Sequence, residues 1–452
     1  MRRPTRSFMS MAALAVSAAL VLGGCGGGGS GTGQTAPKKA VSQSAIDKAM
    51  NTPTKLTFWT WVPNIENEVK LFEKQYPKID VNVVNVGSGA DEYRKLRTVL
   101  KAGKGAPDVT QIEYQYLPSF VLGNNLVDLA PYGASKIKSD YQSWIWSQVS
   151  RGGAVYGIPQ DTGPMGLLYR TDLLKKAGIA PPTTWDEFAQ ASKTYHQKNP
   201  DGYLTDLPGN DPGQFVGFLW QAGAQPFSYD GKQTVSIKLD SPEVTKVADY
   251  WTKLVKSGSV ATDPDFNDQW YQSLAKGKYA SWLTAAWGPV FLQGTAKNTS
   301  GLWHATKLPQ YPGEPVASGN WGGSTDAVLK GTNHEIAAAQ LALWINTNEK
   351  SAMQLATKQF LFPPSKKVLQ NPKWLNEKSA FYGGQQVNKE FAQINQTVNK
   401  DFGWLPFQDY VYSSFNDTVG KAIANHGDLT AAVKTWQSQL VSYAKQQGFT
   451  VK

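Results

Sequence analysis

Strand-like and helix-like segments alternate between residues 55 and 123, and this alternation restricts the fold more than any other feature of the sequence. Three runs are rich in apolar residues and read as strands: 55–61, 79–86 and 107–112. Three segments between and after them read as helices: 65–76, 91–101 and 117–123. Short joints between alternating strands and helices are typical of a mostly parallel sheet that is flanked by helices. The sequence therefore predicts an α/β fold.

Polar and aromatic residues follow two of these predicted strands. Ligands of open α/β sheets bind beyond the carboxyl ends of the strands, so these residues are candidates for ligand contacts. They are Trp61, Asn64, Glu113, Tyr114 and Gln115. Glu113 is the strongest candidate, because an isolated carboxylate beside an apolar strand is unfavourable without a partner. A capping or hinge hydrogen bond is the alternative role for Glu113.

The stretch 155–170 is apolar at both ends and polar in its middle, and glycine and proline interrupt it repeatedly. Interior Gly and Pro weaken a strand and mark a bend or a close backbone approach. We interpret the stretch as a bent strand that crosses between two lobes, with Gln160 and Asp161 at the bend. A surface hairpin is the alternative interpretation. Two later proline-containing segments, 308–315 and 360–364, are predicted to be the other crossings.

The N-terminal part of the chain reads as an export signal followed by a tether. Residues 1–6 are basic and residues 8–22 are apolar. The apolar run is shorter than the roughly 20 residues of a membrane span and is typical of a signal peptide. Cys25, the one cysteine, follows Leu-Gly-Gly, which resembles the lipobox of bacterial lipoproteins. We expect a signal peptide over 1–24, a lipid on Cys25, and a flexible, glycine-rich tether over 25–54.

Charge and aromatic content narrow the range of functions. The net charge is +10, but the lysines are dispersed and form no basic cluster, which argues against a nucleic-acid partner. The chain has 16 Trp and 19 Tyr, side chains that favour places where one side is apolar and the other is wet. This content is compatible with the binding of sugars, although most of these rings are expected in the core.

An ordered series of short motifs resembles the family 1 extracellular solute-binding proteins, which are carbohydrate receptors of ABC importers and relatives of maltose-binding protein. The motifs lie at 55–61, 72–77, 107–109, 126–129, 156–159, 169–170, 184–188, 286–289 and 317–324. The resemblance covers roughly residues 55–450.

The resemblance implies a periplasmic-binding-protein-like fold of type II, in which two α/β lobes are joined by a multi-strand hinge around a ligand cleft. The lobes are expected to comprise residues 55–163 with 316–363 and residues 164–315 with 364–452. Such a protein is expected to be a monomeric, lipid-anchored receptor at the outer face of the cytoplasmic membrane. It would bind a carbohydrate, in particular an oligosaccharide, and deliver it to the membrane subunits of an ABC importer. No cofactor and no metal are expected.

A sugar site needs flat aromatic surface for the apolar ring faces and planar hydrogen-bonding groups for the hydroxyls. The resemblance places aromatic platforms at Trp287, Trp321 and Trp404. Phe407 and Tyr412 are instead expected to pack in the core. The full set of expected ligand contacts is Trp61, Asn64, Glu113, Tyr114, Gln160, Asp161, Trp287, Asn320, Trp321, Gly323 and Trp404.

Two other functions stay open at this point. Glu113 and Asp161 would suit a secreted glycoside hydrolase if they flanked a glycosidic bond. However, the four His residues are scattered, and no nucleophile elbow or P-loop is present in the sequence. A receptor for iron or phosphate is the other alternative, with Tyr114 or Tyr410 as iron ligands. We expect a receptor and not an enzyme.

Overall fold

The computed structural model describes residues 39–452. The predicted signal peptide, Cys25 and the first part of the predicted tether lie outside the described residues. None of the helices in residues 39–452 combines the length and the apolar composition that a membrane crossing requires.

The tether that we expect to reach residue 54 ends earlier, because residues 43–50 form helix α1 (Gln43–Met50). The Ser42 hydroxyl accepts a hydrogen bond from the Ala45 amide (3.3 Å) and caps the first turn. Met50 is buried, and the helix contacts α12 (Glu335–Thr347). The helix therefore belongs to the folded body.

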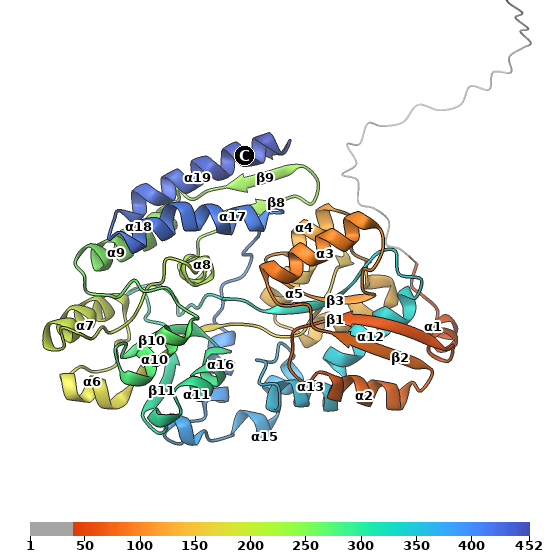
Figure 1. The fold of residues 1–452 in the computed structure, drawn as a ribbon, viewed down its shortest axis with the longest axis horizontal. Helices are drawn as coiled ribbons and strands as arrows, with labels where there is room; N and C mark the ends of the chain where they lie inside the picture. The colour runs from red at the N-terminus through yellow and green to blue at the C-terminus, as the bar shows by residue number, and fades with distance from the viewer. Residues whose placement is uncertain (1–38) are drawn as a thin grey trace, which may run out of the picture. The chain divides into compact units, whose positions relative to one another are not determined.

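Five strands form the largest sheet, in the order β2-β1-β3-β12-β6 (Figure 1). They are β1 (Thr54–Trp59), β2 (Ile79–Val84), β3 (Val109–Glu113), β6 (Ile158–Pro159) and β12 (Ser324–Val328). Strand β1 pairs in parallel with β2 and β3, whereas β12 is antiparallel to β3 and β6. The predicted alternation is confirmed, because β1, β2 and β3 are each followed by a helix. These helices are α2 (Glu66–Gln75), α3 (Ala90–Ala102) and α4 (Leu117–Leu122).

The remaining strands form smaller sheets. One has the antiparallel order β10-β7-β11, with β7 (Met165–Arg170), β10 (Ser281–Ala285) and β11 (Trp303–Lys307). Another has the order β13-β9-β8, with β8 (Phe227–Tyr229), β9 (Thr234–Ile237) and β13 (Thr450–Val451). Strands β4 (Ser150–Arg151) and β5 (Ala154–Val155) pair with each other.

Helices make up most of the rest of the described chain. The remaining α-helices are α5 (Ser143–Val149), α6 (Thr171–Ala177), α7 (Trp185–Lys198), α8 (Pro212–Gln221), α9 (Pro242–Lys256), α10 (Asp268–Lys276), α11 (Gly288–Thr295), α13 (Glu349–Thr357), α14 (Lys366–Leu369), α15 (Pro372–Leu375), α16 (Val387–Asn395), α17 (Gln408–Phe415), α18 (Lys421–Ala424) and α19 (Leu429–Gln446).

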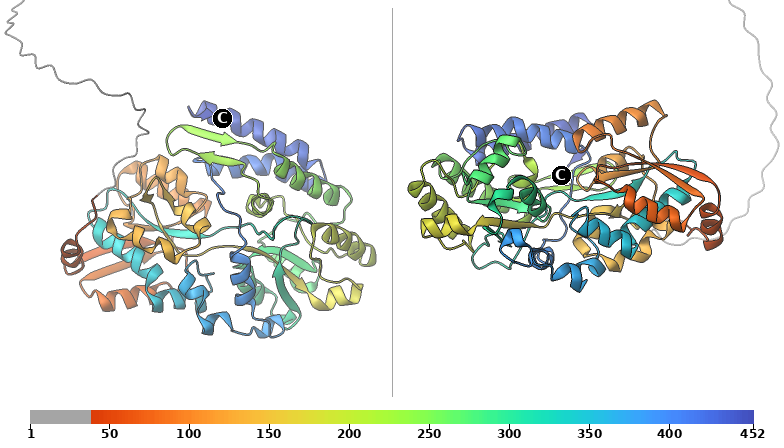
Figure 2. Two further views of the ribbon diagram at one scale, coloured as in Figure 1. Left: turned by 180° about the vertical axis from the view of Figure 1, so that it is seen from behind. Right: turned by 60° about the horizontal axis from the view of Figure 1, so that its bottom comes forward.

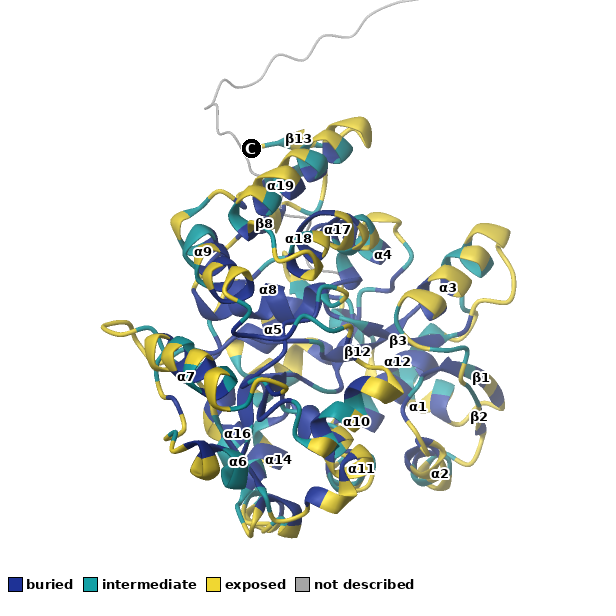
Figure 3. Cartoon of the chain, turned by 60° about the vertical axis from the view of Figure 1, so that its left-hand side comes forward, coloured by how far each residue is buried: buried dark blue, intermediate teal, exposed yellow. Residues whose placement is uncertain are grey.

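Helix α8 is buried along its whole length (Figure 3). Its sequence is apolar on all sides, which is typical of a helix inside a core. Asp211 caps its first turn: one carboxylate oxygen accepts hydrogen bonds from the amides of Gly213 (2.7 Å) and Gln214 (3.2 Å). The helix therefore fixes the position of the Asp211 carboxyl group.

The chain passes from the largest sheet to the β10-β7-β11 sheet between β6 and β7, through residues 160–164 (Figures 1 and 2). It returns between β11 and β12, where the Trp321 amide donates to the Gly163 carbonyl (2.8 Å). A third segment touches these two, because the Thr162 amide donates to the Phe362 carbonyl (3.1 Å). The predicted bent strand is thus confirmed, and the surface-hairpin alternative is wrong, since β6 and β7 belong to different sheets. The exact lobe boundaries stay a prediction.

Candidate functional site

Glu113 ends β3, at the carboxyl edge of the largest sheet. Its carboxylate accepts hydrogen bonds from the Tyr93 hydroxyl (3.0 Å) and the Gln115 side-chain amide (3.0 Å). The pKa of Glu113 is raised to about 7, chiefly by burial and further by the nearby carboxylates of Asp161 and Asp211, whereas the hydrogen bonds from Tyr93 and Gln115 lower it. Glu113 thus lies near two other acids that come from distant parts of the chain.

Asp161 lies in the first crossing and connects it to β12. Its carboxylate accepts hydrogen bonds from the Ser324 amide (2.7 Å) and from the Ser324 hydroxyl. The Tyr114 hydroxyl donates to the backbone carbonyl of Asp161 (2.9 Å). Gly323 makes this packing possible, because its φ is +94° and a Cβ there would lie 2.7 Å from the Tyr114 ring. Asp161, Tyr114 and Gly323 therefore hold the junction of the crossings together.

Gln160 and Asn320, two further predicted contacts, are also used within the crossings. The Gln160 amide donates to the Asp326 carboxylate (2.9 Å). The Asn320 oxygen accepts from the Gly163 amide (2.9 Å), and its nitrogen donates to the Gly322 carbonyl (2.8 Å). Each of these two side chains is 2% exposed, so their polar groups serve the hinge.

The structure brings Trp287 and Trp321 together beside the crossings. Their ring centroids are 4.8 Å apart and the rings are nearly perpendicular, at 74°. The Trp287 indole donates to the Trp321 carbonyl (2.9 Å), which anchors the residue before α11 to the returning crossing. Trp287 is half-buried and Trp321 is 8% exposed. We call this pair of rings the platform; its exposed surface comes mainly from Trp287.

Three further predicted contacts, Trp404, Trp61 and Asn64, make hydrogen bonds to other parts of the chain. Trp404 is 7% exposed, and its indole donates to the Gln148 side chain (2.6 Å) in the core. Trp61 and Asn64 lie in the loop after β1, where the Trp61 amide donates to Gln111 (3.2 Å). The backbone carbonyl of the exposed Asn64 accepts a hydrogen bond from the Gln359 side-chain amide (3.3 Å).

Two carboxyl groups that the sequence analysis does not single out lie near the platform. Asp211 caps α8, and a Cβ on the following Gly213 would lie 2.4 Å from the Trp321 indole nitrogen. Asp265 is 4% exposed and accepts a hydrogen bond from the Asn210 side chain (3.0 Å). Burial and the nearby Asp211 carboxylate raise the pKa of Asp265 well above its ordinary value. The Asp265 side chain also lies within hydrogen-bonding reach of the Asp211 carboxyl group.

Tyr412, which we expect in the core, lies on α17 near the acids. Its ring centroid is 6.2 Å from that of Tyr116. Burial raises its pKa, and the charges of Glu113 and Asp211 add to that effect. The sequence signal for Asp211 is the Asp-Pro pair, which is typical of the start of a helix. No local sequence signal distinguishes Tyr412 from the aromatic residues around it.

The arrangement suits a ligand with apolar ring faces and a rim of hydroxyls. The half-buried Trp287 ring offers apolar surface, while the carboxyl groups of Glu113, Asp211 and Asp265 offer hydrogen-bonding oxygens. In the part of the chain that the structure describes, no three His, Cys, Asp or Glu side chains gather as they would around a metal ion.

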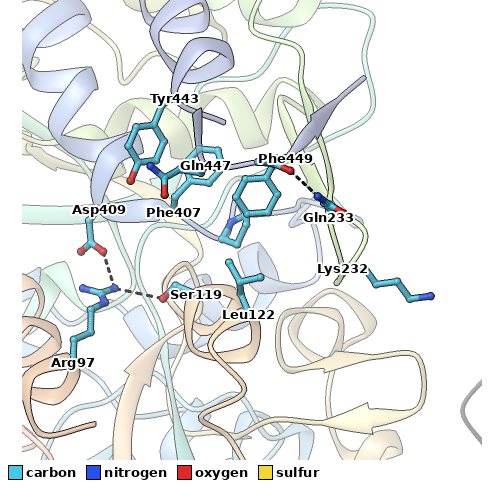
Figure 4. A pocket seen from close by; sticks show the side chains of 12 residues that line it. Arg97, Ser119, Leu122, Lys232, Gln233, Phe407, Asp409, Tyr443, Gln447 and Phe449 are labelled. Carbon is cyan, nitrogen blue, oxygen red and sulfur yellow. Dashed lines mark hydrogen bonds and ion pairs between the residues drawn. The ribbon is translucent and has the colours of Figure 1, made fainter. Parts of the chain in front are cut away.

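A separate cavity of about 510 Å³ lies between α3, α4, β9, α17 and α19 (Figure 4). Within it, the Arg97 guanidinium forms an ion pair with the Asp409 carboxylate (2.6 Å). Phe407, Tyr443 and Phe449 contribute aromatic lining. None of the expected ligand contacts lines this cavity, so it is distinct from the site around Trp287.

Comparison with known proteins supports a family assignment. The sequence matches the family described as bacterial extracellular solute-binding protein over residues 59–352. It is 27% identical to the lactose-binding protein of Rhizobium radiobacter over 383 residues, which cover 78% of this chain and 86% of the relative.

Two solved structures are similar over most of the chain. The ABC transporter associated binding protein from B. animalis subsp. lactis Bl-04, in complex with beta-1,6-galactobiose, shares 31% identity and a TM-score of 0.76, covering 89% of this chain and 100% of its own. The galacto-N-biose-/lacto-N-biose I-binding protein from Bifidobacterium longum, in complex with lacto-N-biose, shares 27% identity and a TM-score of 0.77, covering 88% and 98%.

Proposed function

Because the chain belongs to the bacterial extracellular solute-binding proteins, we propose that it is a carbohydrate receptor that delivers its ligand to an ABC importer. It has the α/β, type II fold of periplasmic binding proteins. Family members are substrate-binding components of transporters and act outside the cytoplasmic membrane. The relatives described above bind lactose, beta-1,6-galactobiose and lacto-N-biose, which supports a sugar ligand.

The observation that carries this proposal is the Trp287–Trp321 pair beside buried carboxyl groups. The rings are 4.8 Å apart and anchored by a hydrogen bond to the returning crossing. An aromatic ring next to several carboxyl groups matches both the apolar faces and the hydroxyl edges of a sugar.

We infer that ligand binding closes two lobes, comprising residues 55–163 with 316–363 and residues 164–315 with 364–452. Glu113 comes from the largest sheet, whereas Trp287 follows β10 of another sheet. A ligand that touches both residues favours the arrangement in which the sheets approach each other, and it shifts the population toward that arrangement. The closed receptor then meets the membrane subunits of the importer.

The contacts of the two acids favour a receptor over a glycoside hydrolase. Asp161 is occupied by two hydrogen bonds from Ser324, and Glu113 by bonds from Tyr93 and Gln115. An iron receptor is also disfavoured, since the Tyr114 hydroxyl donates within the hinge and the Tyr410 ring stacks on Tyr443 at 3.8 Å.

A calorimetric screen tests the proposal, using purified residues 39–452 with lactose, β-1,6-galactobiose and lacto-N-biose and then a wider set of oligosaccharides. We expect saturable binding with no change in the sugar. Product analysis after incubation is the control, because hydrolysis of any of these sugars would contradict the receptor function.

We also propose that Cys25 carries the lipid that holds the receptor at the outer face of the membrane. The proposal rests on the lipobox-like sequence that precedes Cys25. In cells, labelled palmitate should enter the full-length chain and not the Cys25→Ala variant, which should be found in the soluble fraction. Equal labelling of both chains would contradict it.

A further inference from the structure

Phe266 lies in the loop before α10 with an unusual backbone conformation. Its φ is +56°, in the left-handed region, and its side chain is 42% exposed. A bulky residue with positive φ is an outlier, and such strain persists where the surrounding structure imposes it, often at ligand sites. The loop therefore holds an aromatic ring in the open at a conformational disadvantage.

The Phe266 ring extends the platform of the proposed sugar site. Its centroid is 5.9 Å from that of Trp287 and 5.9 Å from that of Trp321. The ring of Phe291 on α11 also contacts Trp287, with the centroids 5.7 Å apart, and is 47% exposed. Helix α10 begins two residues after Phe266, and α11 carries Phe291. The two helices contact each other and lie side by side (Figures 1 and 3).

We name the four rings of Phe266, Trp287, Phe291 and Trp321 the aromatic surface. Its two phenylalanines are among the five large apolar residues that are exposed in the part of the chain that the structure describes. Contiguous exposed apolar side chains mark binding sites in soluble proteins.

We propose that Phe266 and Phe291 form an outer subsite that stacks against a further ring of an oligosaccharide whose first rings occupy the Trp287–Trp321 platform. This inference rests on the proposed function and deepens it. The occupant is a sugar because both phenylalanine rings contact Trp287, the ring that the proposed sugar site exposes, with centroids 5.9 and 5.7 Å from it. The Phe266 ring contacts both indole rings and is still 42% exposed, which suits the apolar face of a pyranose with its hydroxyls in solvent. The ligand is therefore longer than the platform alone can cover.

Phe360 provides a matched control for Phe266. Its φ is +59° and its side chain is 55% exposed, so residue type, backbone strain and exposure are all similar. It lies in the third crossing, next to Leu361, and away from the aromatic surface. A Phe360→Ala substitution removes the same amount of exposed aromatic surface without touching the proposed subsite.

The test measures affinity by calorimetry for galactose, β-1,6-galactobiose, β-1,6-galactotriose and β-1,6-galactotetraose, and for lactose and lacto-N-biose. Wild type is compared with Phe266→Ala, Phe291→Ala and Phe360→Ala. We expect wild-type affinity to rise with each ring up to the length that fills the outer subsite. Phe266→Ala and Phe291→Ala should lose about tenfold in affinity for the longest oligomers and little for the disaccharides. Phe360→Ala should match wild type throughout.

Different results overturn different claims. If wild type binds none of these sugars and no other oligosaccharide, the proposed function fails, and the outer subsite fails with it. If wild type binds but Phe266→Ala and Phe291→Ala match Phe360→Ala at every length, the outer subsite alone is overturned. An equal loss at all lengths, disaccharides included, also overturns it, because the rings would then support the inner platform only. Thermal unfolding of each variant confirms that it is folded.

Discussion

Several buried carboxyl groups have pKa values far above their ordinary range, and each one ties stability to pH. Burial raises the pKa of Glu92 from 4.5 to about 8 and that of Asp206 from 3.8 to about 8. Glu113 is raised to about 7 for the same reason. The folded protein therefore binds more protons than the unfolded chain between about pH 4.5 and pH 8, so its free energy of unfolding falls as pH rises through this window.

We expect the midpoint of thermal unfolding of the ligand-free protein to be several degrees higher at pH 5 than at pH 8. Glu92 is fully buried, and only one of its oxygens accepts a hydrogen bond, from Thr110 (3.1 Å). Glu92→Gln should reduce this pH dependence, because an amide needs no proton. A midpoint that rises from pH 5 to pH 8 in wild type would show that these groups are ionised in the folded state.

Gly323 is the residue whose replacement should disturb the hinge most directly. With φ at +94°, an alanine there is strained, and its Cβ would also press on the Tyr114 ring at 2.7 Å. We expect Gly323→Ala to lower the free energy of unfolding by about 2–4 kcal/mol. Gly331→Ala is the control, since φ there is +95° and nothing lies within 4 Å of a Cβ. It should lose only about 1 kcal/mol; equal losses in chemical denaturation would exclude the Tyr114 contact as the cause.

At the scale of elements, helices α3 and α17 are joined by the Arg97–Asp409 ion pair beside the cavity of Figure 4. Both side chains are partly exposed, at 39% and 46%, so the pair contributes little to overall stability. Helix α3 belongs to the proposed first lobe and α17 to the second, and α17 also carries Tyr412. The pair is therefore placed to favour the arrangement in which the lobes are close.

We expect Arg97→Gln to leave the unfolding midpoint nearly unchanged but to speed sugar dissociation several-fold in stopped-flow measurements. High salt should reduce the difference from wild type, because salt screens the pair. Lys55→Gln removes an ion pair to Asp80 (3.6 Å) within one sheet and should leave dissociation unchanged. The same acceleration in both variants would assign the effect to net charge instead.

Elements were more predictable from sequence than the site. Regular apolar spacing identified the strands and helices up to residue 123, and the glycines and prolines of 155–170 marked the passage between sheets. The sequence does not predict α1, because its segment is largely polar and comes after a glycine-rich stretch. Its contact with α12, which buries Met50, cannot be recognised from the sequence. Glycines lie beside Trp287, Trp321 and Trp404 alike, so this signal does not predict that the Trp404 indole donates to Gln148 in the core.

At the scale of the whole molecule, the site is assembled from segments that are far apart in the chain. Asp211 and Tyr412 lie near Glu113, and Asp265 lies near Asp211, only because three crossings bring the sheets together. Periodicity describes which face of an element is apolar, but it carries no information about which distant elements meet. Most of the residues that sequence reasoning missed are of this kind.

The central claim is that the Trp287–Trp321 platform binds sugar, and calorimetry of one pair of variants tests it most directly. Trp287→Ala and Trp344→Ala each remove a half-buried indole, but Trp344 lies on α12, where it donates to Gln75 (2.9 Å). With lactose, β-1,6-galactobiose and lacto-N-biose as ligands, we expect Trp287→Ala to bind at least about tenfold more weakly than wild type and Trp344→Ala to bind as wild type does. Unchanged affinity in Trp287→Ala, or an equal loss in both variants, would contradict the claim.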